Sequence, residues 1–394
     1  MNALWNVSRR RFLQAAGAVG AGLVLGNPLA WAEGKKEADG RTRTNVDDAL
    51  AVPRTDHSLP GPFPGRVVEV HDPAAMPGGS PDPATVEAMF GRGIQALTRR
   101  NLRDSFHLFF DRTDTVGIKV NPVGAGLIST RLELVDAIIA WLVAHGIRRN
   151  KIVIWDRFDS MLAEAGFTPK RYPGIRIEGL QTMDEAAFTG EAKDDSGWLN
   201  ADGLHVSARR FDPDVYYWAD VEGPEDKNYL NQHVFNGRKS PFGRLVTRDL
   251  TKIINVPVFK NTGNGVSMAT KNLGYGAICN TGRLHQPLFF DVCTEVLAFP
   301  AIRDKLVLNV MDGLRGQYDG GPMPVADKAF VHNRIYLATD PFAMDRVGHD
   351  QMVAKRKEMG VRVNEHPKYS EYLHYAERLG LGVADPSRIE HVVV

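Results

Sequence analysis

The 394-residue sequence contains only two cysteines, Cys279 and Cys293. A four-thiolate iron–sulfur cluster or zinc knuckle needs more cysteine ligands than the chain has, so both kinds of site are excluded. Two alternatives stay open for the pair: one disulfide in an oxidising compartment, or two buried thiols that pack as small apolar side chains. The cysteines therefore restrict the cofactor without identifying it.

Several common catalytic signatures are also missing. The sequence has no H-E-x-x-H or H-x-H pattern, no G-x-S-x-G elbow, no Walker loop and no dinucleotide-binding fingerprint. These absences argue against a standard α/β-hydrolase and leave nucleotide binding with little support. A metal site would have to be assembled from isolated histidines, and an isolated histidine is more often structural.

Neither sign of charge predominates. The chain has 48 lysines and arginines against 47 acidic residues, and three of the arginines lie within the first twelve residues. The balance predicts no nucleic-acid partner and no attraction to an anionic membrane surface. Any anion site must therefore be a local arrangement of side chains.

The first 32 residues have the pattern of an export signal. Residues 8–14 (SRRRFLQ) precede an apolar, glycine- and alanine-rich run over 15–26, and an A-x-A sequence ends at Ala32. This pattern is similar to twin-arginine signals and predicts the twin-arginine export machinery as a partner, cleavage after Ala32 and a periplasmic mature protein. The apolar run is shorter than the roughly 20 residues of a spanning helix, which argues against a permanent membrane anchor.

Residues 66–394 alternate between apolar strands and amphipathic helices. Strands predicted over 115–120 (TVGIKV) and 151–156 (KIVIWD) flank a helix predicted over 131–145. Such a βαβ crossover implies parallel strands. We therefore predict an α/β fold, with a mostly parallel sheet flanked by helices.

Two further segments differ from this pattern. Residues 33–65 are polar and rich in proline and glycine, which predicts an extended linker or a strap across the surface. Residues 184–250 place Trp and Tyr among many polar residues, and we interpret them as a β-rich insertion or lid. Aromatic side chains there could stack on sugars, but packing beneath a polar insertion is the simpler interpretation.

The polar side chains of most interest follow predicted strands. A strand predicted over 253–259 precedes Lys260-Asn261, a loop and then Lys271-Asn272, and Lys119-x-Asn121 ends the strand 115–120. Ligands of open α/β sheets bind beyond the carboxyl ends of the strands. Ammonium and amide groups gathered there would suit an anionic or carbonyl-rich ligand. The predicted ligand-binding residues are Lys119, Asn121, Asn261, Asn264 and Asn272.

Four residues are candidates for catalysis: Lys260, Lys271, His285 and Asp312. Burial could lower the pKa of a lysine toward a general-base or Schiff-base role. His285 could transfer a proton or bind a metal, and Asp312, at the end of a strand predicted over 305–311, could act as a base or bind a hard cation. The alternative is that the lysines lie along apolar surface and the asparagines close turns.

Aspartates also mark a helix predicted over 341–359. Asp340 directly precedes Pro341, so it is the expected N-cap, and proline suits the first helical turn. Asp345 follows one turn later, on a face that could turn toward the sheet.

Several short motifs recur in a familiar order: Gly117–Pro122, Ile254–Lys260 with Lys271–Gly274, Met311–Gly313 with Gly320–Pro322, Thr339–Asp345, and Gly380–Gly382 with Asp385. In this order the chain resembles domain-of-unknown-function family 362 (DUF362) over most of residues 66–394. The resemblance implies no assigned activity. Some relatives carry cysteine-rich ferredoxin-like modules, which this chain lacks, so no electron transfer through a built-in cluster is implied.

Two classes of function fit these observations. One is an enzyme acting on a small anionic or polyhydroxylated substrate held by lysine and asparagine side chains, with His285 or Asp312 transferring a proton. The other is a non-catalytic periplasmic ligand-binding, metal-binding or maturation factor. Lysine pKa values close to that of free lysine would favour the second. If Lys119, Lys260 and Lys271 lie on different sides of the molecule, no such site exists.

Overall fold

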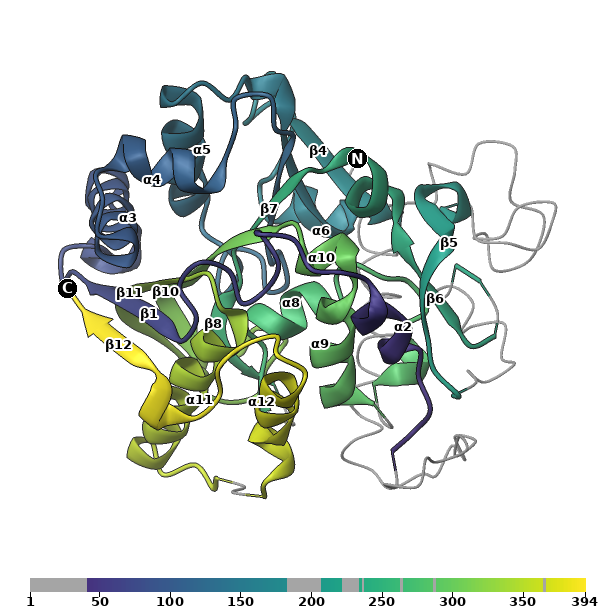
Figure 1. The fold of residues 1–394 in the computed structure, drawn as a ribbon. Coiled ribbons are helices and arrows are strands. Elements are labelled where there is room, and N and C mark those ends of the chain that lie inside the picture. Colours follow the sequence, from purple (N-terminus) through teal and green to yellow (C-terminus); the bar gives the residue numbers. More distant parts are fainter. Residues whose placement is uncertain are drawn as a thin grey trace, which may run out of the picture.

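The computed structural model describes residues 41–182, 207–221, 234–235, 237–262, 265–285, 288–363 and 366–394. The predicted signal peptide, residues 33–40, parts of the 184–250 segment and Asn264 lie outside these ranges. Figure 1 shows the strands at the centre, with helices on either side.

A ten-stranded sheet organises the fold. Its main order is β12-β1-β11-β10-β7-β2-β3-β4, while β8 pairs with β10 and β9 pairs with β8. The neighbours from β10 to β4 are parallel, and β11 runs antiparallel to both of its neighbours. The strands are β1 (Arg66–His71), β2 (Val116–Lys119), β3 (Ile152–Phe158), β4 (Arg176–Gln181), β7 (Lys252–Asn255), β8 (Val258–Thr262), β9 (Gly265–Val266), β10 (Leu306–Gln317), β11 (Ala329–Ala338) and β12 (Glu390–Val393). The predicted, mostly parallel α/β fold is confirmed.

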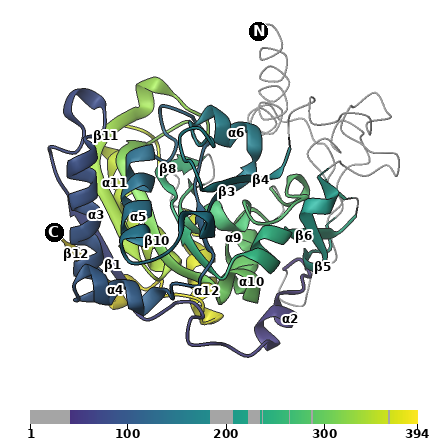
Figure 2. The ribbon, with the colours of Figure 1, turned by 90° about the horizontal axis from the view of Figure 1, so that it is seen from above.

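Helices cover both faces of this sheet. Successive strand residues alternate between two cores: Ile254 and Leu337 pack with α3 and α5, whereas Ile253 and Tyr336 belong to the clusters on the other face. Figure 1 shows α3, α4 and α5 above the sheet and α11 and α12 below it, and Figure 2 shows α3 and α5 side by side. The helices are α2 (Val46–Ala51), α3 (Pro83–Thr98), α4 (Leu102–Phe109), α5 (Leu132–Ala144), α6 (Asp159–Glu164), α8 (Ala269–Gly274), α9 (Phe289–Ala298), α10 (Pro300–Arg303), α11 (Pro341–Glu358) and α12 (Lys368–Arg378).

The single strand predicted over 253–259 is in fact two. β7 ends at Asn255 and β8 begins at Val258, with Pro257 between them. Proline has no N–H to donate to a strand ladder, which favours the break at this point. As a consequence, Lys260-Asn261 lies inside β8, whereas Lys271-Asn272 lies on α8 and not beside a strand end.

The strand predicted to end at Met311 is also longer than expected. β10 continues to Gln317 because it pairs with β11 beyond a bulge, with Arg315 opposite Val331. Asp312 therefore lies within the strand. The cap prediction is confirmed, since Asp340 accepts hydrogen bonds from the backbone N–H groups of Phe342 and Ala343 at the start of α11.

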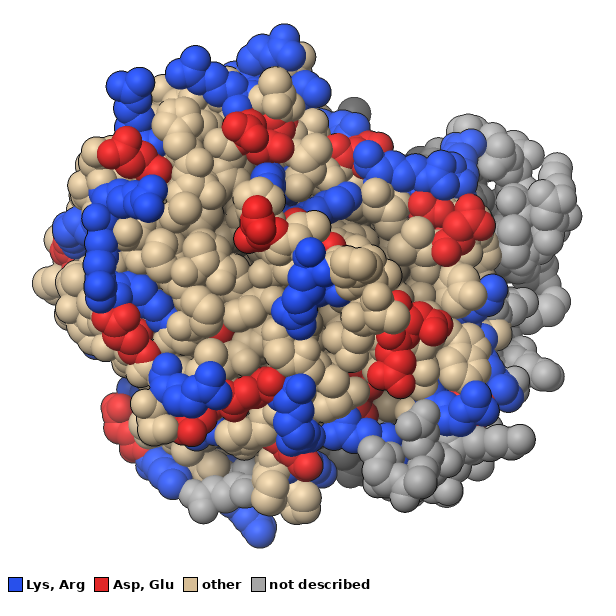
Figure 3. Space-filling model, in the orientation of Figure 1, with Lys and Arg blue, Asp and Glu red and all other residues tan. Residues whose placement is uncertain are grey.

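The described part of the 184–250 segment contains a separate antiparallel hairpin. It consists of β5 (Phe211–Trp218) and β6 (Lys239–Gly243), which confirms its β-rich character. Among the helices in the described ranges, none is both long and apolar enough to cross a membrane. Basic and acidic side chains are interspersed on the face shown in Figure 3.

Candidate functional site

Three polar side chains form one row across the centre of the sheet. Lys119 of β2 lies opposite Asn255 of β7, which lies opposite Asn309 of β10. All three are completely buried. A buried polar group destabilises the fold unless it is hydrogen-bonded, so this row needs partners from elsewhere in the chain.

Helix α8 lies against this row and supplies one of those partners. Its N-terminus is held by Asp345 of α11, which accepts from the N–H groups of Ala269 (2.7 Å) and Thr270 (3.0 Å) and from the Thr270 hydroxyl (2.6 Å). The first N–H groups of a helix lack partners within it, so this carboxylate serves as a cap supplied by another helix. Asp345 thereby fixes the segment that carries Lys271 and Asn272.

Four asparagine side chains then form a continuous chain of hydrogen bonds beginning at Lys260. The donor–acceptor links are Lys260 Nζ to Asn121 Oδ1 (2.9 Å), Asn121 Nδ2 to Asn272 Oδ1 (3.2 Å), Asn272 Nδ2 to Asn255 Oδ1 (2.8 Å), Asn255 Nδ2 to Asn309 Oδ1 (2.9 Å) and Asn309 Nδ2 to the Thr339 carbonyl (3.2 Å). Every link donates in the same direction. The chain therefore turns the amide oxygen of Asn121 toward Lys260.

The ammonium group of Lys119 is fully occupied by protein acceptors. It pairs with the carboxylate of Asp156 and donates to the Val120 carbonyl (2.8 Å) and to Asn272 Oδ1 (3.0 Å). Burial lowers the pKa of Lys119, and the charge of Asp156 opposes that shift. An ammonium has three N–H donors, so Lys119 positions Asn272 and has no donor left for a ligand.

Lys260 is equally buried, but it has only two acceptors within the part of the chain that the structure describes. Its ammonium donates to Asn121 Oδ1 (2.9 Å) and to the Val123 carbonyl (2.9 Å). Burial is the main cause that lowers the pKa of Lys260 to about 7, followed by the positive charge of Lys271. At neutral pH the charged and neutral forms of Lys260 are therefore both populated.

Lys271 has no hydrogen-bond or ion-pair partner anywhere in the described ranges. Its Nζ lies 5.3 Å from the ring centroid of Phe289 and 6.0 Å from that of Tyr275. Aromatic faces attract cations but do not neutralise them. Burial lowers the pKa of Lys271, and the neighbouring thiol of Cys293, whose pKa burial raises, supplies no negative charge at neutral pH.

His285 packs beside this lysine as an uncharged side chain. Its Nδ1 lies 2.8 Å from the Thr281 carbonyl, and its ring centroid is 4.5 Å from that of Tyr275. Burial and then the charge of Lys271 lower the pKa of His285 to about 4. A neutral ring that donates from Nδ1 to a carbonyl presents Nε2 as a hydrogen-bond acceptor, but the lowered pKa makes His285 a weak base near neutral pH.

The lysine pair carries positive charge without a matching acid. Within the described part of the chain, no carboxylate forms an ion pair with Lys260 or Lys271, and Asp156 is already bound to Lys119. A buried cation without a counter-charge is strongly disfavoured. A bound anion would supply the missing charge.

The side chains of Asp312 and Asn261 form no hydrogen bond with the lysine cluster, by which we mean Lys119, Lys260 and Lys271 with the side chains that hold them. Asp312 accepts from the backbone N–H groups of Arg131 (2.7 Å) and Leu314 (3.1 Å), and burial raises its pKa to about 6. These contacts tie it to the residue that precedes α5. Asn261 follows Lys260 in β8 and so faces the opposite way, where its Oδ1 accepts from the Gly321 N–H (3.1 Å). Asn264 lies outside the described residues.

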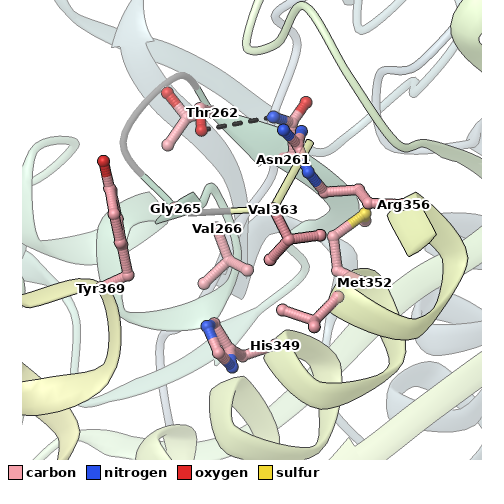
Figure 4. A pocket seen from close by; sticks show the side chains of 10 residues that line it. Asn261, Thr262, Gly265, Val266, His349, Met352, Arg356, Val363 and Tyr369 are labelled. Atoms are coloured by element: carbon pink, nitrogen blue, oxygen red, sulfur yellow. Dashed lines mark hydrogen bonds between the residues drawn. The ribbon is translucent and has the colours of Figure 1, made fainter. Parts of the chain in front are cut away.

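Asn261 lines a small pocket between β8, β9 and the C-terminal helices (Figure 4). Its volume is about 50 Å³, enough for a few water molecules at most. Neither Lys260 nor Lys271 lines it. The lining residues are Asn261, Thr262, Gly265, Val266, His349, Met352, Val353, Arg356, Val363 and Tyr369.

Four further residues hold Lys119, Lys260 and Lys271 in place: sequence reasoning missed Asp156, Asn255 and Asn309, and it placed Asp345 on a sheet-facing side of its helix without giving it this role. Three of them share a signal, because each is the polar residue in or at the end of an otherwise apolar run, as in IINV, LVLNV and KIVIWD. A polar residue in such a run needs a buried partner. Asp345 had no comparable signal, since its role depends on where α8 begins.

The structure also bears on the cysteines and on metal binding. Cys279 and Cys293 are both buried and free, which decides between the two alternatives left by the sequence. Burial raises the pKa of Cys279 to about 12, so its thiol is neutral at physiological pH. No group of three or more His, Cys, Asp or Glu side chains in the described ranges is arranged to hold a metal ion.

Comparison with known proteins gives one family match. No curated protein matches the chain. Residues 217–350 match the family model described as Domain of unknown function (DUF362). This span holds β7, β8, α8 and β10, whereas Lys119 and Asn121 precede it. The chain is thus similar to DUF362 over residues 217–350, the part that supplies Lys260, Lys271 and the capping Asp345.

Proposed function

We propose that the protein is an enzyme that acts on a small anionic substrate bound at Lys260 and Lys271. The observation that carries this proposal is the completely buried Lys260 together with the partly buried Lys271, since neither has a carboxylate partner among the described residues. A substrate carboxylate or phosphate would provide the counter-charge and the missing hydrogen-bond acceptors. The site would therefore select its ligand first by charge.

The two lysines have different proposed roles. Lys271, which has no acceptor among the residues that the structure describes, would bind the anionic group. Lys260 has a pKa of about 7, which is the value at which a general acid or base works best near neutral pH. His285 would act as a neutral acceptor, and the asparagine chain would hold Lys260 in place.

The amide groups disfavour the polyhydroxylated substrate that the sequence also suggested. Asn121, Asn255 and Asn272 each use their oxygen and their amide nitrogen within the chain of hydrogen bonds. Little of their capacity is left for sugar hydroxyl groups. An anion recognised by the two ammonium groups agrees better with this arrangement.

A non-catalytic ligand-binding or maturation factor is the second candidate. It is favoured by the burial of Lys260, since a closed site suits retention of a ligand. The lowered pKa values of Lys119, Lys260 and Lys271 favour the enzyme, because a binding protein has no need of a lysine that titrates near neutral pH.

The test is a substitution of Lys271. In Lys271→Gln, affinity for lactate, pyruvate or phosphate should fall roughly 10- to 100-fold, since a charged hydrogen bond contributes about 1.5–3 kcal/mol. Calorimetry or ligand-dependent melting temperature measures the change, and Lys170→Gln, at an exposed position, is the control. Equal anion binding by the wild type and Lys271→Gln, or none by the wild type, would rule out the proposed site.

We further propose that the protein reaches the periplasm by twin-arginine export, with cleavage after Ala32. The basis is the SRRRFLQ sequence over residues 8–14 and the A-x-A sequence that ends at Ala32. Replacing Arg9 and Arg10 together by lysine should keep the full-length chain in the cytoplasm on fractionation. Processed periplasmic protein from that variant would contradict the proposal.

A further inference from the structure

We propose that Lys260 forms an imine with the carbonyl carbon of a small oxo acid whose carboxylate binds Lys271. This inference rests on the proposed function and narrows its substrate to anionic aldehydes and ketones. It follows from the acceptors around Lys260 and from the position of the second cation.

The described residues leave one tetrahedral corner of Lys260 Nζ without a hydrogen-bond acceptor. The Cε atom takes one corner, and Asn121 Oδ1 and the Val123 carbonyl, each at 2.9 Å, take two more. In the ammonium form the fourth corner holds an N–H. In the neutral amine it holds the lone pair, provided that the two remaining N–H groups still donate to the two protein acceptors.

The neutral amine of Lys260 still donates one hydrogen bond to each of these two acceptors. The Val123 carbonyl can only accept. The Asn121 oxygen can only accept as well, and its orientation is fixed because its amide nitrogen donates to Asn272, the next residue of the asparagine chain. The lone pair of the neutral amine is therefore directed to the free corner. Lys119 offers no such corner, since three acceptors occupy its ammonium group.

The second cation, Lys271, determines that the substrate must carry a negative charge. The positive charge of Lys271 acts on Lys260 and helps to lower its pKa, and Lys271 forms no ion pair among the described residues. A desolvated lysine beside another cation is the environment that makes an amine nucleophilic at neutral pH. Tyr275 and Phe289 flank Lys271, so the short carbon chain of a substrate bound there would lie against aromatic rings.

The reaction is a condensation that needs no oxidant or reductant. The amine nitrogen of Lys260 attacks the carbonyl carbon, and one N–H proton passes to the carbonyl oxygen to give a carbinolamine. The hydroxyl group then leaves as water with one proton from the medium. The product is a protonated imine whose single N–H stays within reach of Asn121 or Val123.

The experiment traps this imine in the wild-type protein. The protein is incubated near pH 7 with glyoxylate or pyruvate, reduced with borohydride and mapped by peptide mass spectrometry. The reduced adduct should saturate with ligand concentration and be at least about tenfold more abundant on Lys260 than on Lys119 or the exposed Lys170. Lactate, which has the carboxylate but no carbonyl group, should slow the trapping.

The outcomes separate this inference from the function on which it rests. If neither oxo acid labels Lys260 but lactate stabilises the wild type and not Lys271→Gln, the imine is ruled out and the anion site stands. If there is no labelling and no stabilisation, both are ruled out. Labelling spread evenly over exposed lysines would also overturn the imine, and labelling of Lys260 that lactate does not slow would overturn the role of Lys271.

Discussion

Lys119 and Lys260 show how neighbouring contacts give two identical side chains different roles. Both are completely buried. Lys119 is saturated by one carboxylate and two oxygen acceptors, whereas Lys260 has two neutral acceptors and an adjacent cation. Only Lys260 therefore combines a free position with a pKa near neutrality.

The buried Lys260 should make the stability of the unliganded protein depend on pH. Its pKa falls from 10.5 to about 7 on folding, so between these values the unfolded chain binds more protons. The free energy of unfolding should therefore rise as pH rises through this window and stay low below pH 7. The contribution of this one group is roughly 3–5 kcal/mol.

Denaturant unfolding at several pH values measures this dependence. Lys260→Met should flatten the rise of the unfolding free energy with pH, and Lys119 and Lys271, whose pKa values are also lowered, should account for the part that is left. Substitution of the exposed Lys170 by methionine should leave the rise unchanged. The slope against pH is the relevant quantity, because the methionine also leaves the acceptors at Asn121 and Val123 without a donor. A Lys260→Met slope equal to that of the wild type would mean that Lys260 titrates as an ordinary lysine.

Among the secondary-structure elements, α8 is the one on which the site depends most. It has six residues and is anchored through Asp345, which caps it from α11. The packing just after α8 also leaves no space for a side chain at Gly276. A Cβ atom added to Gly276 would lie 2.4 Å from Lys119 Cε and 2.3 Å from the Asn272 carbonyl oxygen.

Asp345→Ala should loosen α8 and weaken anion binding together. Loss of a cap and of buried hydrogen bonds should lower the free energy of unfolding by roughly 2–4 kcal/mol. Because Lys271 lies on α8, affinity for lactate or pyruvate should fall as well. Urea unfolding and calorimetry measure the two effects.

Asp350→Ala is the matched control for Asp345→Ala, because both aspartates lie on α11. The Asp350 side chain is half exposed and, among the described residues, pairs only with Arg346 and His349, so the change in stability should be within about 0.5 kcal/mol. If Asp345→Ala lost stability but bound anions with wild-type affinity, α8 would not position the site.

The sequence was sufficient for elements whose pattern is local. The predicted crossover of 115–120, 131–145 and 151–156 corresponds to β2, α5 and β3 within a few residues. The break between β7 and β8 has a local signal in Pro257, which the prediction of a single strand over 253–259 passed over. The length of β10 depends on strand pairing, and α8 depends on a cap from a residue more than seventy positions away, so neither follows from local composition.

For the molecule as a whole, the site exists only because two distant parts of the chain share one sheet. β2, from the first half, is inserted between β7 and β3, which places Lys119 and Asn121 beside Asn272 and Lys260. The sequence predicted that these lysine and asparagine motifs would converge, but it gave no means to tell the saturated Lys119 from the available Lys260. The distinction depends on how many hydrogen-bond acceptors surround each ammonium group, which only the structure shows.

The central claim is that Lys260 is poised near neutral pH by burial and by an unneutralised neighbour, and that an anion completes the site. The most direct measurement is an NMR titration of the protein labelled with ¹³C and ¹⁵N in its lysine side chains, with the Lys260 signal assigned by its loss in Lys260→Arg. The account predicts a midpoint near pH 7 without ligand and a higher midpoint with bound lactate, which stabilises the ammonium form. A Lys260 midpoint near the ordinary 10.5, unmoved by lactate, would contradict it.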